Sequence, residues 1–354
     1  MYFFRSHNAY GSITVIFIVL TIAAAECRHI VTMDIAGAYL NASMSSVVVH
    51  MYFEPALATM LCELVPAYSR FLMKDGRIVV KLDKALYGCI ESAKLWYQHL
   101  KGTLEGLGFV PNPEEGCCFN RGVGDMQCTV IVYVDDLLVT CKDADTISGV
   151  IQALKVKYHD VQEHTGVKHS YLGMSLDMSV TGVCSITMPM FISEVLKDVE
   201  LGSVVTPASD TLFMIDESSP LLDETRRKRF HSKVAQLLYL GKRIRMDILT
   251  AVAFLTTRVT KATQEDDGKL LRVLKYLRGT ADIGLVLDGR EGIAVEVYAD
   301  ASHAVHDDAK RHSGAIARVG KAIVYASSTK QKVMSRSSFE AELNSLHEVI
   351  PQVM

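Results

Sequence analysis

Two adjacent acidic residues, Asp135 and Asp136, separate two apolar, β-rich runs at 129–134 and 137–140. This pattern predicts a β-hairpin with both carboxylates at its tip. Adjacent carboxylates repel each other, and a divalent cation such as Mg²⁺, which prefers hard oxygen ligands, would offset that repulsion. Because aspartate is also a common turn former, the pair taken alone leaves a purely structural hairpin open as an alternative.

A third carboxylate, Asp34, ends another short β-branched run at 29–33. If the two strands bring Asp34 and Asp135 side by side, the carboxylates would form a two-metal centre for in-line phosphoryl transfer. One ion would lower the pKa of an attacking 3′-hydroxyl, and the other would hold a triphosphate and the leaving pyrophosphate. Asp34, Asp135 and Asp136 are therefore predicted as catalytic and metal-binding residues for two Mg²⁺ ions, with Mn²⁺ as the alternative metal.

Hydrophobic periodicity indicates the elements that must position these carboxylates. The likeliest linker is 203–224, which contains Pro207 and Pro220 and little periodicity. Strands are expected at 185–188 and again from 293 onward, with a last helix beginning near Ser338. Helices are expected within 86–104, at 147–157, at 226–257 and at 268–277.

The apolar run at 12–25 follows Arg5 and ends in small residues, as a signal peptide does. It is short for a membrane span, which needs about 20 residues. We predict instead a buried helix that leads into the strand of Asp34. The protein is accordingly expected to be intracellular, in a cytoplasmic particle or the nucleus, with no membrane partner.

Composition limits the class of protein. The chain has 354 residues, 49% of them hydrophobic, which predicts an ordinary globular protein of two or three domains. Its net charge of −3 gives no support to a nucleic-acid partner, so any such support must come from local basic patches. The eight cysteines form no CxxC pair and are predicted to be reduced and mostly buried.

Several short motifs, taken in order, resemble one family. The segment 33–41 resembles the first polymerase motif of reverse transcriptases, in which an aromatic follows the aspartate by five residues, and 133–140 resembles the third. The segment 81–88, with Trp96 and Tyr97 after it, is similar to the copia-type second motif. Matches to the primer-grip turn and to later copia-type elements follow at 171–174, 237–240, 245–248 and 275–280. The chain is thus identified as resembling the reverse transcriptase/RNase H region of a copia-type retrotransposon polyprotein.

The resemblance implies further roles. Tyr39 would stack under the sugar and exclude a ribose 2′-hydroxyl, although a buried aromatic after a strand is the alternative. Gly88 would let the backbone approach the incoming nucleotide or template closely. Tyr133 and Gly173, the latter in the primer-grip turn, complete the predicted substrate-binding residues. For Asp136, orienting the site rather than ligating directly is the alternative role.

Near the C-terminus, 297–302 resembles the first Asp-bearing strand of an RNase H domain, and 327–331 and 337–343 resemble its next two elements. This makes Asp300 and Glu342 the expected carboxylates, with Glu340 as the alternative to Glu342. The family needs a further aspartate on a strand after this helix, and we expect the RNase H unit to be truncated and inactive. Arg5 and Arg28 are the only Lys or Arg residues before Asp34, so the basic fingers region is also expected to be incomplete.

The implied fold is α+β: a ferredoxin-like reverse transcriptase palm with residual fingers (1–202), a linker with a helical thumb or connection (203–290), and a truncated RNase H-like α/β unit (291–354). The expected function is RNA-directed DNA polymerase. The alternatives are an inactive retrotransposon remnant and a non-enzymatic nucleic-acid-binding protein.

Expected partners are an RNA template, a DNA primer, the RNA–DNA hybrid, dNTPs and other parts of the polyprotein. Basic side chains at 226–245 and at every third residue of 269–278 would follow a phosphate backbone. A solvated charged face is the alternative reading of both stretches.

Overall fold

The computed structural model describes residues 12–45, 48–197, 202–302, 306, 310–332 and 337–353. These residues form two compact units of mixed α/β structure, one from residues 31–164 and the other from residues 12–30 with 165–354. The boundary at 164/165 follows packing and does not coincide with the predicted boundaries at 202/203 and 290/291. The division into palm, connection and RNase H-like domains therefore stays a prediction.

The first unit is built on a six-stranded sheet with the order β4-β5-β6-β7-β1-β8. Strands β6 and β7 pair antiparallel as the predicted hairpin, and β7 has β1 as its other neighbour. The strands are β1 (His29–Ile35), β4 (Val110–Pro111), β5 (Cys118–Arg121), β6 (Cys128–Tyr133), β7 (Asp136–Cys141) and β8 (Val161–Thr165). Strands far apart in the chain thus become neighbours in the sheet.

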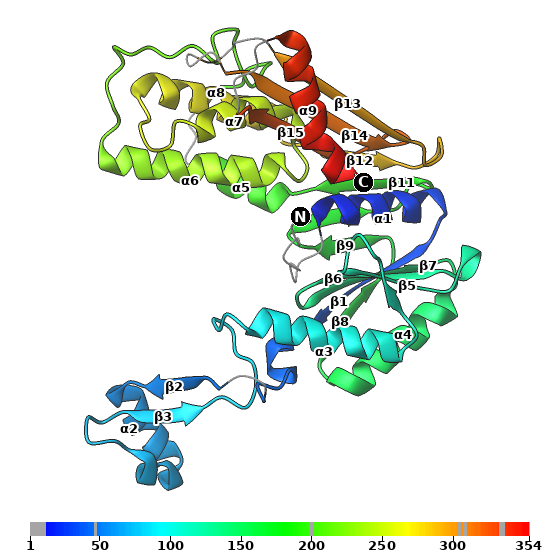
Figure 1. The fold of residues 1–354 in the computed structure, drawn as a ribbon, viewed down its shortest axis with the longest axis vertical. Helices are drawn as coiled ribbons and strands as arrows, with labels where there is room; N and C mark the ends of the chain where they lie inside the picture. Colours follow the sequence, from blue (N-terminus) through cyan, green and yellow to red (C-terminus); the bar gives the residue numbers. More distant parts are fainter. Residues whose placement is uncertain are drawn as a thin grey trace. The chain divides into compact units, whose positions relative to one another are not determined.

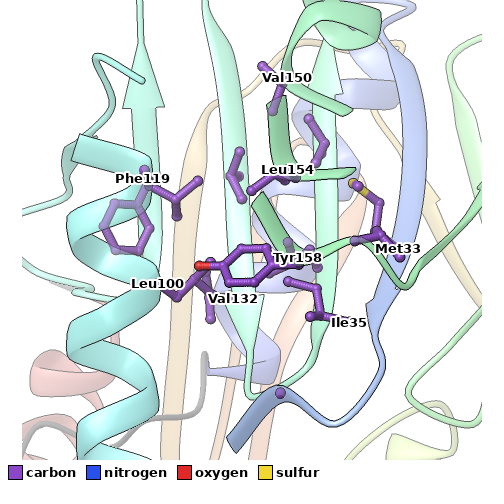
Figure 2. Close-up of a cluster of buried hydrophobic side chains, with 14 of the residues drawn as sticks. Met33, Ile35, Leu100, Phe119, Val132, Val150, Leu154 and Tyr158 are labelled. Atoms are coloured by element: carbon purple, nitrogen blue, oxygen red, sulfur yellow. The ribbon is translucent and has the colours of Figure 1, made fainter. Parts of the chain in front are cut away.

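Two helices, α3 (Ser92–Gly106) and α4 (Ala144–Tyr158), pack onto this sheet (Figure 1). Their apolar side chains join strand residues in one core, where Leu100 and Leu154 lie near Val132 and Phe119 (Figure 2). β6 and β7 are buried almost throughout their length. This packing holds the acid-bearing ends of β6, β7 and β1 in fixed positions.

Shorter elements complete the first unit. A second antiparallel pair, β2 (His50–Phe53) with β3 (Ile78–Lys81), accompanies the helix α2 (Pro55–Leu64). Three 3₁₀ segments lie in this part of the chain: η1 (Ala38–Asn41), η2 (Pro66–Phe71) and η3 (Gly124–Met126).

The second unit contains two antiparallel sheets, with orders β12-β11-β10-β9 and β13-β14-β15. Their strands are β9 (Lys168–Tyr171), β10 (Met174–Asp177), β11 (Val183–Thr187), β12 (Leu285–Asp288), β13 (Val295–Ser302), β14 (His312–Val319) and β15 (Ala322–Lys330). The helical elements are α1 (Ile13–Ala25), α5 (Pro189–Leu196), α6 (Glu224–Gly241), η4 (Met246–Ile248), α7 (Leu249–Thr256), α8 (Gln264–Gly279) and α9 (Ser338–Val353).

The N-terminal apolar run is a buried helix, as predicted. α1 packs against β11, β12 and β15, and its side chains Ile16, Phe17 and Leu20 are fully buried. Gly289, the residue after β12, approaches α1 so closely that an added Cβ would lie 2.7 Å from the Cβ of Ala25. No helix among the described residues is long and apolar enough to cross a membrane.

Most predicted elements are present. The helix expected across 226–257 is interrupted after α6, because the chain turns at Lys242–Arg245 before η4 and α7 begin. All eight cysteines are free and five are buried, which confirms the prediction of reduced, mostly buried thiols. Burial raises the pKa of Cys117 and of Cys184 to about 12, so these thiols stay protonated at neutral pH.

Candidate active site

The tip of the β6–β7 hairpin carries the adjacent aspartates. Tyr133 pairs with Asp136, which leaves Val134 and Asp135 as a two-residue loop. Val134 has a φ of 60°, a left-handed conformation that is costly for a β-branched residue. Its carbonyl oxygen accepts a 2.6 Å hydrogen bond from Nε1 of Trp96, a fully buried residue of α3. The helix therefore holds the loop in a conformation that the loop sequence alone disfavours.

Asp34 lies beside this tip, near the end of β1. The amide of the next residue, Ile35, donates a 3.1 Å hydrogen bond to the carbonyl oxygen of Asp135. The amide of Ala36 donates another, also 3.1 Å, to the carbonyl oxygen of Asp160 at the start of the next strand. The sheet order thus brings together the three carboxylates that the sequence separates by about a hundred residues.

Electrostatic repulsion links the three carboxylates. Partial burial, and then the negative charges of Asp135 and Asp160, raise the pKa of Asp34. Burial followed by the charges of Asp135 and Asp34 raises the pKa of Asp136 to about 6. Carboxylates that are partly buried and close together disfavour each other's ionised form. A bound divalent cation would offset this repulsion.

Two tyrosines stand next to the acidic cluster. The hydroxyl of Tyr87 donates a 3.3 Å hydrogen bond to Oδ2 of Asp135, and its ring centroid lies 4.3 Å from that of Tyr39. Tyr39, in η1, is buried, whereas Tyr87 is about half exposed at 51%. Of the two rings, it is Tyr87 that presents a surface to solvent beside the carboxylates.

Tyr87 is a site residue that sequence reasoning missed. It stands in the motif 81–88 that pointed to Gly88, so the signal was present without an assigned role. Gly88 itself has a φ of 97°, which favours glycine, and an added Cβ would meet no atom within 4 Å. The requirement for glycine here is therefore conformational, while the predicted close approach of a nucleotide stays a prediction. Tyr133 is half-buried at the base of the hairpin loop.

The donor set suits a hard cation. Among the described residues, no three His, Cys, Asp or Glu side chains are grouped closely enough to hold a metal ion by themselves. The carboxylates of Asp34 and Asp135 nevertheless supply oxygen ligands, and the negative charge of Asp135 contributes to the raised pKa of Asp34, a repulsion that a cation would offset. Mg²⁺ is commonly held by one or two carboxylates together with substrate phosphates, and this chemistry matches the residues present.

In the second unit, Gly173 lies in a tight turn between β9 and β10. Tyr171 pairs with Met174, which leaves Leu172 and Gly173 as the loop. Both have positive φ, 51° and 76°, the signature of a type I′ hairpin turn. Tyr171 and Met174 are buried, so packing on either side fixes the turn. The predicted turn is confirmed as a structure, and its contact with a primer stays a prediction.

The other predicted carboxylates also lie in the second unit. Asp300, on β13, is exposed and lines a cavity of about 600 Å³ together with Asp247, Tyr298 and Ser328. Glu342 is exposed on α9, and the alternative, Glu340, is half-buried two residues earlier. The helix contacts β13 through Ser345, whose hydroxyl donates a 3.0 Å hydrogen bond to the carbonyl oxygen of Asp300. Among the residues described, no part of α9 lines the cavity of Asp300.

Several basic side chains of the two stretches have partners within the protein. Arg245 is fully buried and forms a bidentate pair with Asp247. Lys233 is buried and donates to the carbonyl oxygen of Val195 at 2.7 Å. Further ion pairs join Arg226 to Asp267, Lys228 to Glu224 and Lys269 to Glu265. The sequence therefore overstated the cationic surface, because several of its charges have structural partners.

Comparison with known proteins identifies the family of the chain. A family model described as reverse transcriptase (RNA-dependent DNA polymerase) matches residues 10–212. The chain is 30% identical over 339 residues to the retrovirus-related Pol polyprotein from transposon RE1 of Arabidopsis thaliana, with 94% of this chain and 22% of the relative covered. It is 28% identical to a putative transposon Ty5-1 protein of Saccharomyces cerevisiae, with 78% of this chain and 90% of the relative covered.

Among solved structures, a truncated apo telomerase from Candida tropicalis matches with 10% identity and a TM-score of 0.28, covering 48% of this chain and 39% of that one. At that TM-score we base nothing on the likeness.

The family model spans more than half of the sequence, and its matched range contains the whole acidic cluster. The chain belongs to the reverse transcriptase (RNA-dependent DNA polymerase) family. More particularly, its relatives are retrotransposon polyproteins, which confirms the resemblance seen in the motifs. The chain spans about a fifth of the length of the two Arabidopsis polyproteins that it matches.

Proposed function

We propose that this chain is an RNA-directed DNA polymerase of a copia-type retrotransposon, transferring nucleotides to the 3′-hydroxyl of a primer. The observation that carries the proposal is that Asp34, Asp135 and Asp136 meet where the neighbouring strands β1 and β7 and the β6–β7 loop come together. Partial burial and then the mutual repulsion of these carboxylates raise the pKa of Asp34 and of Asp136, which supports a site that takes up divalent cations.

Each residue has a role in this proposal. Asp34 and Asp135 would hold Mg²⁺, and Asp136 would orient the site from the base of the hairpin loop. Bound Mg²⁺ would supply charge neutralisation for phosphoryl transfer and a lower pKa for the attacking hydroxyl. Tyr87, which is hydrogen-bonded to Asp135, and Tyr39, whose ring packs against that of Tyr87, would line the binding site of the incoming nucleotide.

Primer extension tests the proposal. The full chain is incubated with a DNA primer on an RNA template, dNTPs and Mg²⁺, beside Asp135→Asn. Asp125→Asn is the matched control, because Asp125 lies in the same unit and is paired with Lys142 rather than with the acidic cluster. We expect extension by the wild type and by the control and none by Asp135→Asn. Template binding without extension by the wild type would instead indicate an inactive remnant or a non-enzymatic nucleic-acid-binding protein.

We further propose that β13, β14 and β15 with α9 form an RNase H-like unit. Its support is the order of three antiparallel strands and a helix, with Asp300 on the first strand. Because the cavity of Asp300 is lined by Asp247 and not by α9, we expect no cleavage of the RNA strand of a hybrid. Hybrid cleavage that disappears in Asp300→Asn would overturn this expectation.

A further inference from the structure

One aromatic side chain, that of Tyr239, lies against the turn between β9 and β10. A Cβ built on Gly173 would lie 3.7 Å from the hydroxyl of Tyr239, which projects from α6. The ring of Tyr239 also packs against Phe191 of α5, with 5.0 Å between ring centroids. Tyr239 thus joins two helices to a turn whose two loop residues both need positive φ.

The same ring fixes a guanidinium group. Cζ of Arg243 lies 3.5 Å from the centroid of Tyr239, a close cation–π contact. Arg243 follows the C-terminus of α6, where the helix dipole favours a positive charge. Its Nε is buried without a hydrogen-bond partner, and it forms no ion pair with any residue that the structure describes.

Arg243 differs in this respect from several of its charged neighbours. Arg226 and Lys228 on the same helix have carboxylate partners, and Arg245 is buried against Asp247. An arginine that is ordered by stacking, next to a tight turn and without an acidic partner, is prepared for an external anion. A guanidinium directs its N–H groups outward in its own plane, so stacking on Tyr239 still leaves hydrogen-bond donors for a phosphate.

We infer that Arg243 binds a backbone phosphate of the nucleic acid held at the Leu172–Gly173 turn, and that Tyr239 is the positioning residue for it. The inference rests on the proposed function and gives it a specific contact. The contact would be independent of base sequence, because phosphate oxygens carry no sequence information. It would release about one condensed counterion on binding.

Salt dependence of binding tests this contact without requiring catalysis. A fluorescent DNA primer annealed to an RNA template is titrated with the full chain between about 50 and 200 mM salt, the range over which phosphate contacts weaken strongly. Arg243→Gln is expected to reduce the slope of log K against log salt by about one, equally for two template sequences. Arg226→Gln, which removes a charge already paired with Asp267, is expected to leave the slope unchanged.

Two more substitutions separate charge from folding. Arg243→Lys keeps the charge and should keep most of the slope. Tyr239→Phe keeps the ring and should bind as the wild type does, whereas Tyr239→Leu should reproduce part of the Arg243→Gln effect. Equal losses in Arg243→Lys and Arg243→Gln, with early thermal melting of both, would show a structural role and overturn the inference.

The outcomes also separate the inference from the proposed function. A wild-type chain that fails to bind primer–template at low salt overturns both. A wild-type chain that binds and extends the primer, with an Arg243→Gln slope equal to that of the wild type, overturns the phosphate contact alone.

Discussion

The indole Nε1 of Trp96 donates a 2.6 Å hydrogen bond to the carbonyl oxygen of Val134, the residue before Asp135. Trp96 is buried in α3, and Val134 occupies the left-handed region of φ. This single bond connects a packed helix to the loop that presents two of the three carboxylates. It explains how a strained valine can be kept at the tip of the hairpin.

Replacing Trp96 by phenylalanine is expected to loosen that loop. The change keeps an aromatic ring in the core but leaves the Val134 carbonyl without its donor, at a cost of about 1–3 kcal/mol of unfolding free energy. Denaturant unfolding measures the loss. Tyr97→Phe is the matched control, because it removes a 2.7 Å bond from the same helix to Gly116, away from the acidic cluster. Primer extension should fall in Trp96→Phe and persist in Tyr97→Phe.

The raised pKa of Asp136, about 6, predicts a trade between stability and metal binding. Between the usual aspartate value and pH 6 the folded chain binds a proton that the unfolded chain has released, so stability falls as pH rises through this window. Asp136→Asn should therefore raise the melting temperature above pH 6 in EDTA. Added Mg²⁺ should stabilise the wild type and leave Asp136→Asn less affected. Equal responses of both proteins to Mg²⁺ would contradict the predicted site.

A buried histidine in the second unit predicts acid sensitivity. Burial, and then the charge of His306, lower the pKa of His312 to about 4. His312 is hydrogen-bonded to His306 and to the hydroxyl of Ser328, and its ring packs on Phe213. As pH falls from about 6.5 toward 4, the unfolded chain gains a proton that the folded chain refuses, so stability decreases.

From the shift in pKa the loss is of the order of 3 kcal/mol, since one unit corresponds to about 1.4 kcal/mol. His312→Gln has no such titration, and its unfolding free energy should depend less steeply on pH in this window. Denaturant unfolding at several pH values between about 4 and 7 checks this, and parallel curves for the two proteins would count against it.

Two glycine-to-alanine substitutions should change the free energy of unfolding in opposite directions. Gly173 has a φ of 76° in the β9–β10 turn, so Gly173→Ala should cost about 1 kcal/mol of unfolding free energy, through its backbone dihedral and not through a clash. Gly102 lies inside α3 and an added Cβ there meets nothing, so Gly102→Ala should stabilise by about 0.5–1 kcal/mol. Midpoints of urea unfolding compare the two directly. A stabilising Gly173→Ala would argue against the type I′ turn.

Local pattern sufficed for much of this structure. The two apolar, β-rich runs on either side of Asp135 and Asp136 predicted the hairpin because strand and turn composition are encoded within a few residues. The apolar run at 12–25 was correctly predicted to be a buried helix, and the last helix was correctly expected to begin near Ser338. The family was likewise evident from short motifs in order, and the family comparison confirms it.

Charge was read less well from sequence. The basic stretch at 226–245 looked like a continuous phosphate-binding face, but Glu224 and Asp247 at its two ends pair with Lys228 and Arg245. The third partner, Asp267, is remote in sequence from Arg226, and only folding reveals that pair. The sequence does not show which acidic side chain will pair with a given basic one, because ion pairs form between side chains that are close in space and often remote along the chain. Arg243 is distinguished from these paired residues by its stacking on Tyr239.

The sequence by itself determined which residues could do chemistry here: three aspartates at strand ends, the tight turns around them and the polymerase family to which they belong. Tertiary structure decided which of those residues meet. Sheet order placed β1 beside β7 and so Asp34 beside Asp135, and α3 brought Trp96 under Val134. It also put Tyr87 against Asp135 and Tyr239 against Phe191. These contacts join residues far apart in the chain, and only the packing of strands and helices around a shared core selects them.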